Sequence, residues 1–201
     1  MIESNNCFDV FDIIGPVMVG PSSSHTAGAV RIGLVAGQLC NYNPKEIKIS
    51  FHGSLASTYK FHKTDAAVVA GIMGMDVDDE RIKNSIEIAK TKEIKLKFGK
   101  IQLENAHPST IVIELIDGKD RKWNIKAASI GGGNILIEEI NRYKVRLDGK
   151  QNCIVCITTI DKSAFGKKIP RILGKQMNSL DFVFEEEFNI LKIISENPLD
   201  D

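Results

Sequence analysis

A cluster of hydroxyl-bearing residues around one histidine lies where the sequence predicts the start of a helix. Residues 20–28 read Gly-Pro-Ser-Ser-Ser-His-Thr-Ala-Gly, with the histidine at His25. The first turn of a helix has unpaired backbone N–H groups and a partial positive charge, which suit a carboxylate or a phosphate. One serine would be enough to cap the helix, so the pattern favours an anion-binding site over a simple cap. The candidate ligands are Ser22, Ser23, Ser24 and Thr26.

Two further segments place histidines beside hydroxyl groups at the ends of predicted elements. Residues 52–58 read His-Gly-Ser-Leu-Ala-Ser-Thr and lead from a strand into a glycine turn. Residues 62–65 read His-Lys-Thr-Asp and precede a helix that the threonine or aspartate could cap. For either histidine alone, an ordinary turn residue is the simpler interpretation. The candidates are His52, Ser54, His62, Thr64 and Asp65.

Two loops complete the set of candidates. Residues 107–110 read His-Pro-Ser-Thr before a strand, and the proline biases the histidine towards an extended backbone. Residues 129–133 read Ser-Ile-Gly-Gly-Gly, whose backbone N–H groups could face an anion or form only a flexible corner. All four histidines of the chain lie in such loop segments, which favours one convergent site. The additional candidates are His107, Ser109, Thr110, Gly131, Gly132 and Gly133.

The spacing of cysteines and histidines predicts no metal site. No histidine pair has the i and i+4 spacing of helical metal ligands, and four cysteines are too few for a disulfide framework. Cys153 and Cys156 form a C-x-x-C inside a predicted strand, where alternation sends residues three apart to opposite faces. Structural cysteines are therefore expected. The sequence also has no Walker-type loop, dinucleotide fingerprint or nucleophile elbow.

The composition is that of a globular protein. The 201 residues include 26 basic and 26 acidic side chains and 43% hydrophobic residues, enough for one large domain with a small module. The zero net charge excludes a globally basic nucleic-acid-binding protein. No apolar run approaches the ~20 residues of a membrane span, and the first residues lack the basic start of a secretory signal. We therefore expect a cytoplasmic protein that binds neither nucleic acid nor membrane.

Hydrophobic periodicity predicts a mixed chain in two parts. Helices are predicted over residues 22–40, 65–73 and 78–92, and strands over residues 47–51, 94–98, 111–116, 123–127, 135–140 and 145–147. This order predicts an α+β fold over residues 1–149, a two-layer α/β sandwich with helices on one side of a mostly antiparallel sheet. Residues 150–201 follow the order β-α-β-β, with strands over residues 152–160, 180–188 and 190–195 and a helix over residues 163–175.

The order of these motifs resembles that of a known enzyme subunit. Asp-Ile-Ile-Gly-Pro precedes the serine-rich segment, and the other motifs follow at the expected spacing, over residues 12–16, 20–29, 52–58, 62–67, 107–110 and 129–133. Over residues 8–149 the chain is similar to the beta subunit of the iron–sulfur-dependent L-serine dehydratases. The resemblance implies an L-serine ammonia-lyase, which converts L-serine to pyruvate and ammonia in amino-acid metabolism and gluconeogenesis.

The resemblance also implies a partner and a cofactor. In this family a 4Fe–4S cluster with an open iron position acts on the serine hydroxyl, and the alpha subunit holds that cluster. This chain would then hold no metal and would contribute polar loops to the L-serine site of a heterodimer. His62 or His25 would handle the proton, because an imidazole titrates near neutral pH. Residues 22–26 would bind the carboxylate of the substrate.

Three positions around His62 depart from the family pattern. The family reads Thr-Gly-Lys-Gly-His-Gly-Thr-Asp, whereas residues 58–65 carry Tyr59, Phe61 and Lys63 in place of the glycines. Side chains at positive φ would strain the loop by ~1–2 kcal/mol each, and rings in a substrate pocket would fill it. The alternative function is therefore a non-catalytic regulatory module that binds a small anion. Ser109 also stands where the family has asparagine.

The predicted tail is similar to the first part of an ACT domain, a ligand-sensing module of ferredoxin-like fold. Its usual Asp-Lys-Pro-Gly loop is replaced by Asp-Lys-Ser-Ala at residues 161–164, and the last helix and strand are not expected. Such a truncated ACT-like βαββ module leaves a sheet edge open. Self-association through this edge and loss of the sensing function are both compatible with the sequence.

Overall fold

The structure is a computed structural model that describes residues 17–150, 152–157, 180–185 and 190–195. The helical elements are η1 (Ser23–Ala27, a π-helical turn), α2 (Gly28–Leu39), α3 (Gly53–Thr58), α4 (Thr64–Ile72), η2 (Glu80–Asn84, a 3-10 helix) and α5 (Ser85–Thr91). The strands are β1 (Pro44–Phe51), β2 (Lys95–Lys100), β3 (Thr110–Asp117), β4 (Lys122–Gly131), β5 (Asn134–Ile140), β6 (Tyr143–Leu147), β7 (Asn152–Ile157), β8 (Leu180–Glu185) and β9 (Ile190–Ser195).

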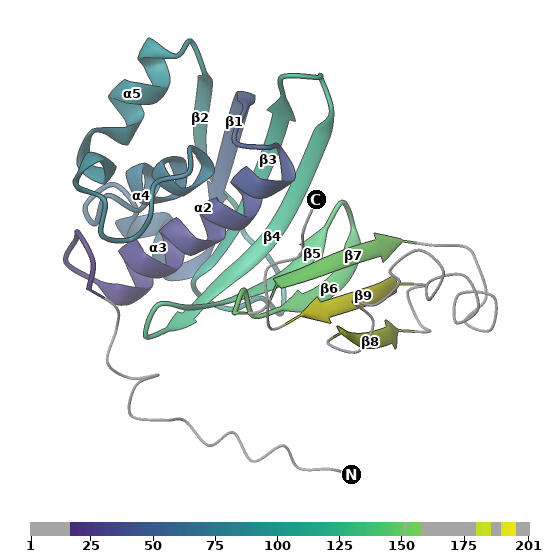
Figure 1. Cartoon of the computed structure of the whole chain (residues 1–201). Coiled ribbons are helices and arrows are strands. Elements are labelled where there is room, and N and C mark those ends of the chain that lie inside the picture. The colour runs from purple at the N-terminus through teal and green to yellow at the C-terminus, as the bar shows by residue number, and fades with distance from the viewer. Residues whose placement is uncertain (1–16, 151, 158–179, 186–189, 196–201) are drawn as a thin grey trace.

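A six-stranded sheet in the order β2-β1-β3-β4-β5-β6 forms the larger part of the fold. Strands β1 and β2 are parallel, and all other neighbouring pairs in this sheet are antiparallel. Figure 1 shows the helices gathered on one side of this sheet, over β1 to β4. The expected α+β arrangement of helices on one side of a mostly antiparallel sheet is therefore confirmed.

Alternating side chains give the sheet one apolar face and one polar face. In β3, Ile111 and Ile113 are fully buried and belong to the same core cluster as the apolar residues of α2 and α4. Their neighbour Glu114 lies on the other face, where its carboxylate pairs with the ammonium group of Lys48 at 2.8 Å. The helices therefore cover the apolar face of the sheet.

Glycines bring α2 and α4 into direct backbone contact. A Cβ atom at Gly33 would overlap the carbonyl oxygen of Val68, and one at Gly71 would overlap the carbonyl oxygen of Val30. Any larger residue at these positions would push the two helices apart. The contact matters for function because α2 follows the serine-rich segment directly and α4 begins in the motif of residues 62–65.

The structure differs from the predicted elements in two places. The helix expected over residues 78–92 is divided into η2 and α5, because Asn84, which ends η2 and caps α5, leaves the helical conformation with φ −111° and ψ 6°. The chain turns at Gly53 as expected, with φ +58°, but the turn leads directly into the short helix α3, which was not predicted. The remaining helices and strands predicted over residues 22–147 are present, with ends shifted by a few residues.

The described part of the C-terminal region consists of three strands. They form an antiparallel sheet in the order β7-β9-β8, in which the backbone of Cys153 lies opposite Ile194 and that of Cys156 opposite Leu191. The three strands predicted in this region are confirmed, whereas the helix predicted over residues 163–175 lies outside the described residues. Among the described residues, none of the helices is long and apolar enough to cross a membrane. A cytoplasmic location stays a prediction.

Candidate functional site

The serine-rich segment forms the start of the first helix, as predicted. Ser22 is the N-cap of η1, and its hydroxyl accepts a hydrogen bond from the backbone N–H of His25 at 3.3 Å. The Nδ1 atom of His25 lies 3.1 Å from the hydroxyl of Ser22 and 3.1 Å from that of Ser24. Two hydroxyl groups therefore hold one edge of the His25 ring in place.

The two predicted catalytic histidines meet in the structure. The ring centroids of His25 and His62 are 4.5 Å apart, and the ring planes are inclined by 43°. The backbone N–H of His62 donates to the carbonyl oxygen of Thr58 at 3.0 Å, which continues the last turn of α3. Lys63 then adopts a left-handed conformation and turns the chain into α4. The site is thus built from the turn between α3 and α4 and from the start of η1.

The electrostatics of this pair favour a neutral His25. Burial lowers the pKa of His25, and the charge that His62 can carry lowers it further. A neutral imidazole can accept a proton from a substrate, which is the role of a general base. The ring of His62 makes no hydrogen bond within the described part of the chain, and the residue is partly exposed.

Two predicted ligands of this site, Thr26 and Thr64, are buried beneath its surface. The hydroxyl groups of Thr26, Thr64 and Ser129 are buried and have no hydrogen-bond partner among the described residues. The side chain of Thr26 instead packs against Gly20, where a Cβ atom would come within 2.6 Å of the threonine hydroxyl. Ser22, Ser23 and Ser24 are partly exposed, so these three serines are the hydroxyl groups of the segment that a ligand can reach.

Asp65 does not cap α4 in the way the sequence suggests. Lys63 occupies the N-cap position, and no side chain there accepts a capping hydrogen bond. The carboxylate of Asp65 lies in the first turn and accepts a hydrogen bond from the N–H of Ala66 at 2.9 Å. Burial raises the pKa of Asp65, and this hydrogen bond opposes the rise. The carboxylate lies in the first turn of the helix, and its burial outweighs the hydrogen bond that favours its charged form.

The loops that carry His52 and His107 pack against each other. The backbone N–H of Ser54 donates to the carbonyl oxygen of Pro108 at 3.0 Å, and that of His52 donates to the carbonyl oxygen of Thr110 at 3.0 Å. Pro108 also packs so tightly against Gly53 that a Cβ atom at this glycine would overlap the proline carbonyl. The sequence prediction that these segments converge is consistent with this contact.

The rings of His52 and His107 both accept hydrogen bonds from backbone N–H groups of other residues. His52 is buried, and its Nδ1 atom accepts a hydrogen bond from the N–H of Leu103 at 3.2 Å. His107 is exposed, and its Nδ1 atom accepts from the N–H of Ser109 at 3.1 Å. The hydroxyl of Thr110 donates to the carbonyl oxygen of His107 at 2.7 Å. These bonds stabilise the loops, and a ligand-binding role for their residues stays a prediction.

Arg31, which was not predicted from the sequence, connects helix α2 to the glycine segment. Gly131 ends β4, Gly132 and Gly133 form the turn to β5, and all three glycines have positive φ. The guanidinium of Arg31 donates to the carbonyl oxygen of Gly133 at 2.8 Å. Arg31 is the one charged residue of α2, a signal that could have pointed to it. Its charge lies near the glycine turn, and the anion-binding role of that turn stays a prediction.

The three altered positions have different structural roles. Tyr59 is 7% exposed and stacks on Phe51 with ring centroids 4.4 Å apart, so its ring fills the core and not the site. Phe61 is 86% exposed. Lys63 has φ +57°, a conformation that costs an ordinary side chain about 1–2 kcal/mol. The sequence prediction of a strained glycine position therefore holds for Lys63 among the three.

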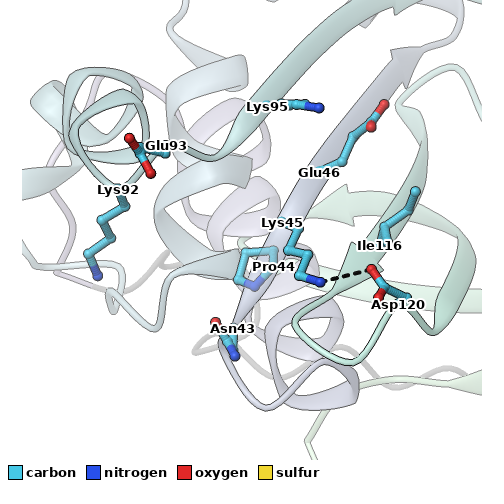
Figure 2. Close-up of a pocket in the computed structure, with 9 residues that line it drawn as sticks. All are labelled: Asn43, Pro44, Lys45, Glu46, Lys92, Glu93, Lys95, Ile116 and Asp120. Atoms are coloured by element: carbon cyan, nitrogen blue, oxygen red, sulfur yellow. Dashed lines mark hydrogen bonds and ion pairs between the residues drawn. The ribbon is translucent and has the colours of Figure 1, made fainter.

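A separate hollow lies at the opposite end of β1 from His52. Figure 2 shows its lining residues, which are Asn43, Pro44, Lys45, Glu46, Lys92, Glu93, Lys95, Ile116 and Asp120. The ammonium group of Lys45 pairs with the carboxylate of Asp120 at 2.8 Å across it. None of the residues selected from the sequence lines this hollow. It therefore serves as a reference region remote from the candidate site.

The described residues do not form a ligand set for a metal cluster. Cys40 is buried, and its thiol donates to the carbonyl oxygen of Gly37 at 3.3 Å. Burial raises the pKa of this thiol, which disfavours the thiolate that binds iron. Within the described ranges, no group of three or more histidine, cysteine, aspartate or glutamate side chains could hold a metal ion.

Comparisons with known proteins identify relatives over most of the chain. The family model for the serine dehydratase beta chain matches residues 6–140. The chain is 48% identical over 166 residues to a probable L-serine dehydratase beta chain of Bacillus subtilis, covering 83% of this chain and 74% of that protein. It is 39% identical over 149 residues to the L-serine dehydratase beta chain of Peptoniphilus asaccharolyticus, covering 74% of this chain and 67% of that protein. L-serine dehydratase 2 of Escherichia coli is 30% identical over 154 residues, which are 33% of its length.

Proposed function

The chain belongs to the serine dehydratase beta chain family, and from this premise we propose that it is the beta subunit of an L-serine dehydratase. With an alpha subunit it would convert L-serine to pyruvate and ammonia. The observation that carries this proposal is the contact between His25 and His62, which joins two motifs from distant parts of the sequence. The partly exposed Ser22 and Ser24 lie against the ring of His25.

We assign the proton-handling role to His62, with His25 as its neighbour. The ring of His62 has both nitrogen atoms free of hydrogen bonds within the described residues, so one of them can accept the α-proton of L-serine. Loss of this proton and of the hydroxyl group gives 2-aminoacrylate and water. The aminoacrylate tautomerises to an imine, which water hydrolyses to pyruvate and ammonia.

The substrate carboxylate would bind at the start of η1. The hydroxyl groups of Ser22, Ser23 and Ser24 are partly exposed there, and unpaired N–H groups of the first turn add a partial positive charge. We place the 4Fe–4S cluster on the alpha subunit, as the resemblance to the iron–sulfur-dependent L-serine dehydratases implies.

The proposal is tested by reconstitution with the alpha subunit. The two chains are co-expressed without oxygen, and pyruvate formation from L-serine is measured with and without this chain. We expect turnover to require it, and His62→Ala to abolish most of the turnover. Lys45→Ala, which removes an ion pair in the remote hollow, is the matched control. Turnover that is unchanged when the chain is omitted would exclude the role of an essential subunit.

A non-catalytic module that binds a small anion is the second candidate. The strained backbone of Lys63, where the family pattern has glycine, is the observation that favours it. In that case the isolated chain would bind L-serine or another small carboxylate in calorimetry, and Ser24→Ala would weaken this binding. Turnover by the alpha subunit would not depend on the integrity of His62.

We further propose that residues 150–201 form a truncated ACT-like module that associates with a second copy. The order β7-β9-β8 with antiparallel neighbours supports this, since the first three strands of a ferredoxin-like unit adopt this order. Light scattering should then give a dimer of the full chain. A monomer at all concentrations would argue against self-association.

A further inference from the structure

The ring of His62 is held in a different way from the ring of His25. Two serine hydroxyls lie within hydrogen-bonding distance of Nδ1 in His25. In the part of the chain that the structure describes, the ring of His62 has two aromatic contacts and no hydrogen bond. One contact is with His25, and the other is with Phe61, at a centroid distance of 5.1 Å and an interplanar angle of 88°. The orientation of His62 therefore depends on the rings that flank it.

The backbone around Phe61 keeps this aromatic ring beside His62. The N–H of His62 donates to the carbonyl oxygen of Thr58 at 3.0 Å, and the N–H of Thr64 donates to that of Tyr59 at 2.8 Å. The ring of Tyr59 is stacked in the core, which fixes the start of this turn. Phe61 itself is 86% exposed, so it adds little to the core. Its contact with His62 is the interaction that the structure gives to its ring.

We propose that Phe61 is a positioning residue for His62. Its ring meets the imidazole edge to face, a favoured geometry for aromatic pairs, and limits the rotation of the His62 side chain. With His25 on another side, the imidazole is confined to an orientation that presents its free nitrogen atoms to a ligand. A well-defined orientation of a general base matters because small misplacements cost large factors in rate. For turnover, this inference rests on the proposed function.

The first test measures the orientation of His62 in the full chain by NMR. The chain has four histidines, so labelled histidine gives four ring signals, and His62→Ala identifies the one from His62. We expect the nuclear Overhauser effect between the rings of His25 and His62 to weaken several-fold in Phe61→Leu and to persist in Phe61→Tyr. Val17→Ala is the control, because Val17 is 88% exposed and apolar. An unchanged effect in Phe61→Leu would overturn the proposal.

The second test measures turnover of the same variants with the alpha subunit. We expect Phe61→Leu to lower kcat roughly tenfold with KM within about twofold, and Phe61→Tyr to restore kcat. The midpoint of thermal unfolding should stay the same in Phe61→Leu, Phe61→Tyr and Val17→Ala. An unchanged kcat, or a rise in KM alone, would contradict a positioning role. Lack of turnover by the wild-type complex would instead contradict the proposed function, and the NMR result would still decide the role of Phe61.

Discussion

The contact between α2 and α4 and the contact between His25 and His62 join the same two parts of the chain in opposite ways. The helices meet through Gly33 and Gly71, where missing side chains let the backbones touch. The histidines meet eight and nine residues before these glycines, and two serine hydroxyls lie against the ring of His25. The difference shows that the glycine contact sets the distance between the two segments. The histidine pair depends on that distance for its arrangement.

The largest expected effect is on turnover and comes from the histidine region. His62→Ala should lower kcat of the reconstituted enzyme by about 10²–10⁴-fold, the usual contribution of a general base. The urea midpoint of the isolated chain should change little, because His62 is only partly buried and outside the core cluster. If His62→Ala unfolds at a lower urea concentration and keeps its kcat, the histidine region contributes to stability and not to turnover, contrary to this prediction.

The second prediction concerns stability and comes from the helix contact. Gly71→Ala places a Cβ atom against the Val30 carbonyl and should lower the free energy of unfolding by roughly 1–3 kcal/mol. Urea unfolding measures this change. Gly99→Ala is the matched control, because its Cβ atom would lie 3.7 Å from the Ser50 hydroxyl, an ordinary contact. Equal stability of the two variants would show that α2 and α4 can move apart without cost.

A smaller gain in stability is expected at the turn between α3 and α4. Lys63→Gly should raise the free energy of unfolding by about 1 kcal/mol, because glycine adopts φ +57° without the strain of a side chain. The comparison with wild-type urea curves measures it. Lys60→Gly is the control, since Lys60 does not have positive φ. If Lys63→Gly loses stability, the lysine side chain makes a contribution that outweighs its strain.

The smallest effect is the dependence of stability on pH. The pKa of His25 is lowered in the folded chain by burial and then by His62, from an ordinary value of 6.5. The folded state thus favours the neutral ring, and this contribution is present above pH 6.5 and decreases as the pH falls below it. His25→Gln should reduce the loss of stability between pH 7.5 and pH 5.5 in urea unfolding. An identical loss in the variant would assign the pH dependence to other groups.

Much of the fold was predictable from local patterns. Hydrophobic periodicity predicted strands over residues 111–116 and 123–127, which are β3 and β4, and a helix over residues 22–40, which corresponds to η1 and α2. The break at Asn84 was missed because the apolar spacing of residues 78–92 continues through it. Periodicity reports which residues face the core, and a local change of backbone conformation does not interrupt that pattern.

The site was predictable as a set of residues and not as an arrangement. Hydroxyl groups and histidines at the ends of helices and strands predicted the functional loops, because ligand-binding residues are commonly placed on loops at the surface. The amino-acid sequence could not show that Thr26 and Thr64 are buried or that Tyr59 stacks in the core. It also could not show that Arg31 binds the Gly133 carbonyl. Burial depends on which segments pack together, and that is a property of the whole chain.

The sequence by itself determined the types of the main elements, the polar start of the first helix and the family of the chain. These depend on local spacing and on motifs, which any stretch of chain carries with it. Only the tertiary structure decided that His25 and His62 share one site while His52 and His107 bond to backbone around them. The physical reason is that the glycine contact between α2 and α4 sets their distance, and no local pattern encodes a distance between helices.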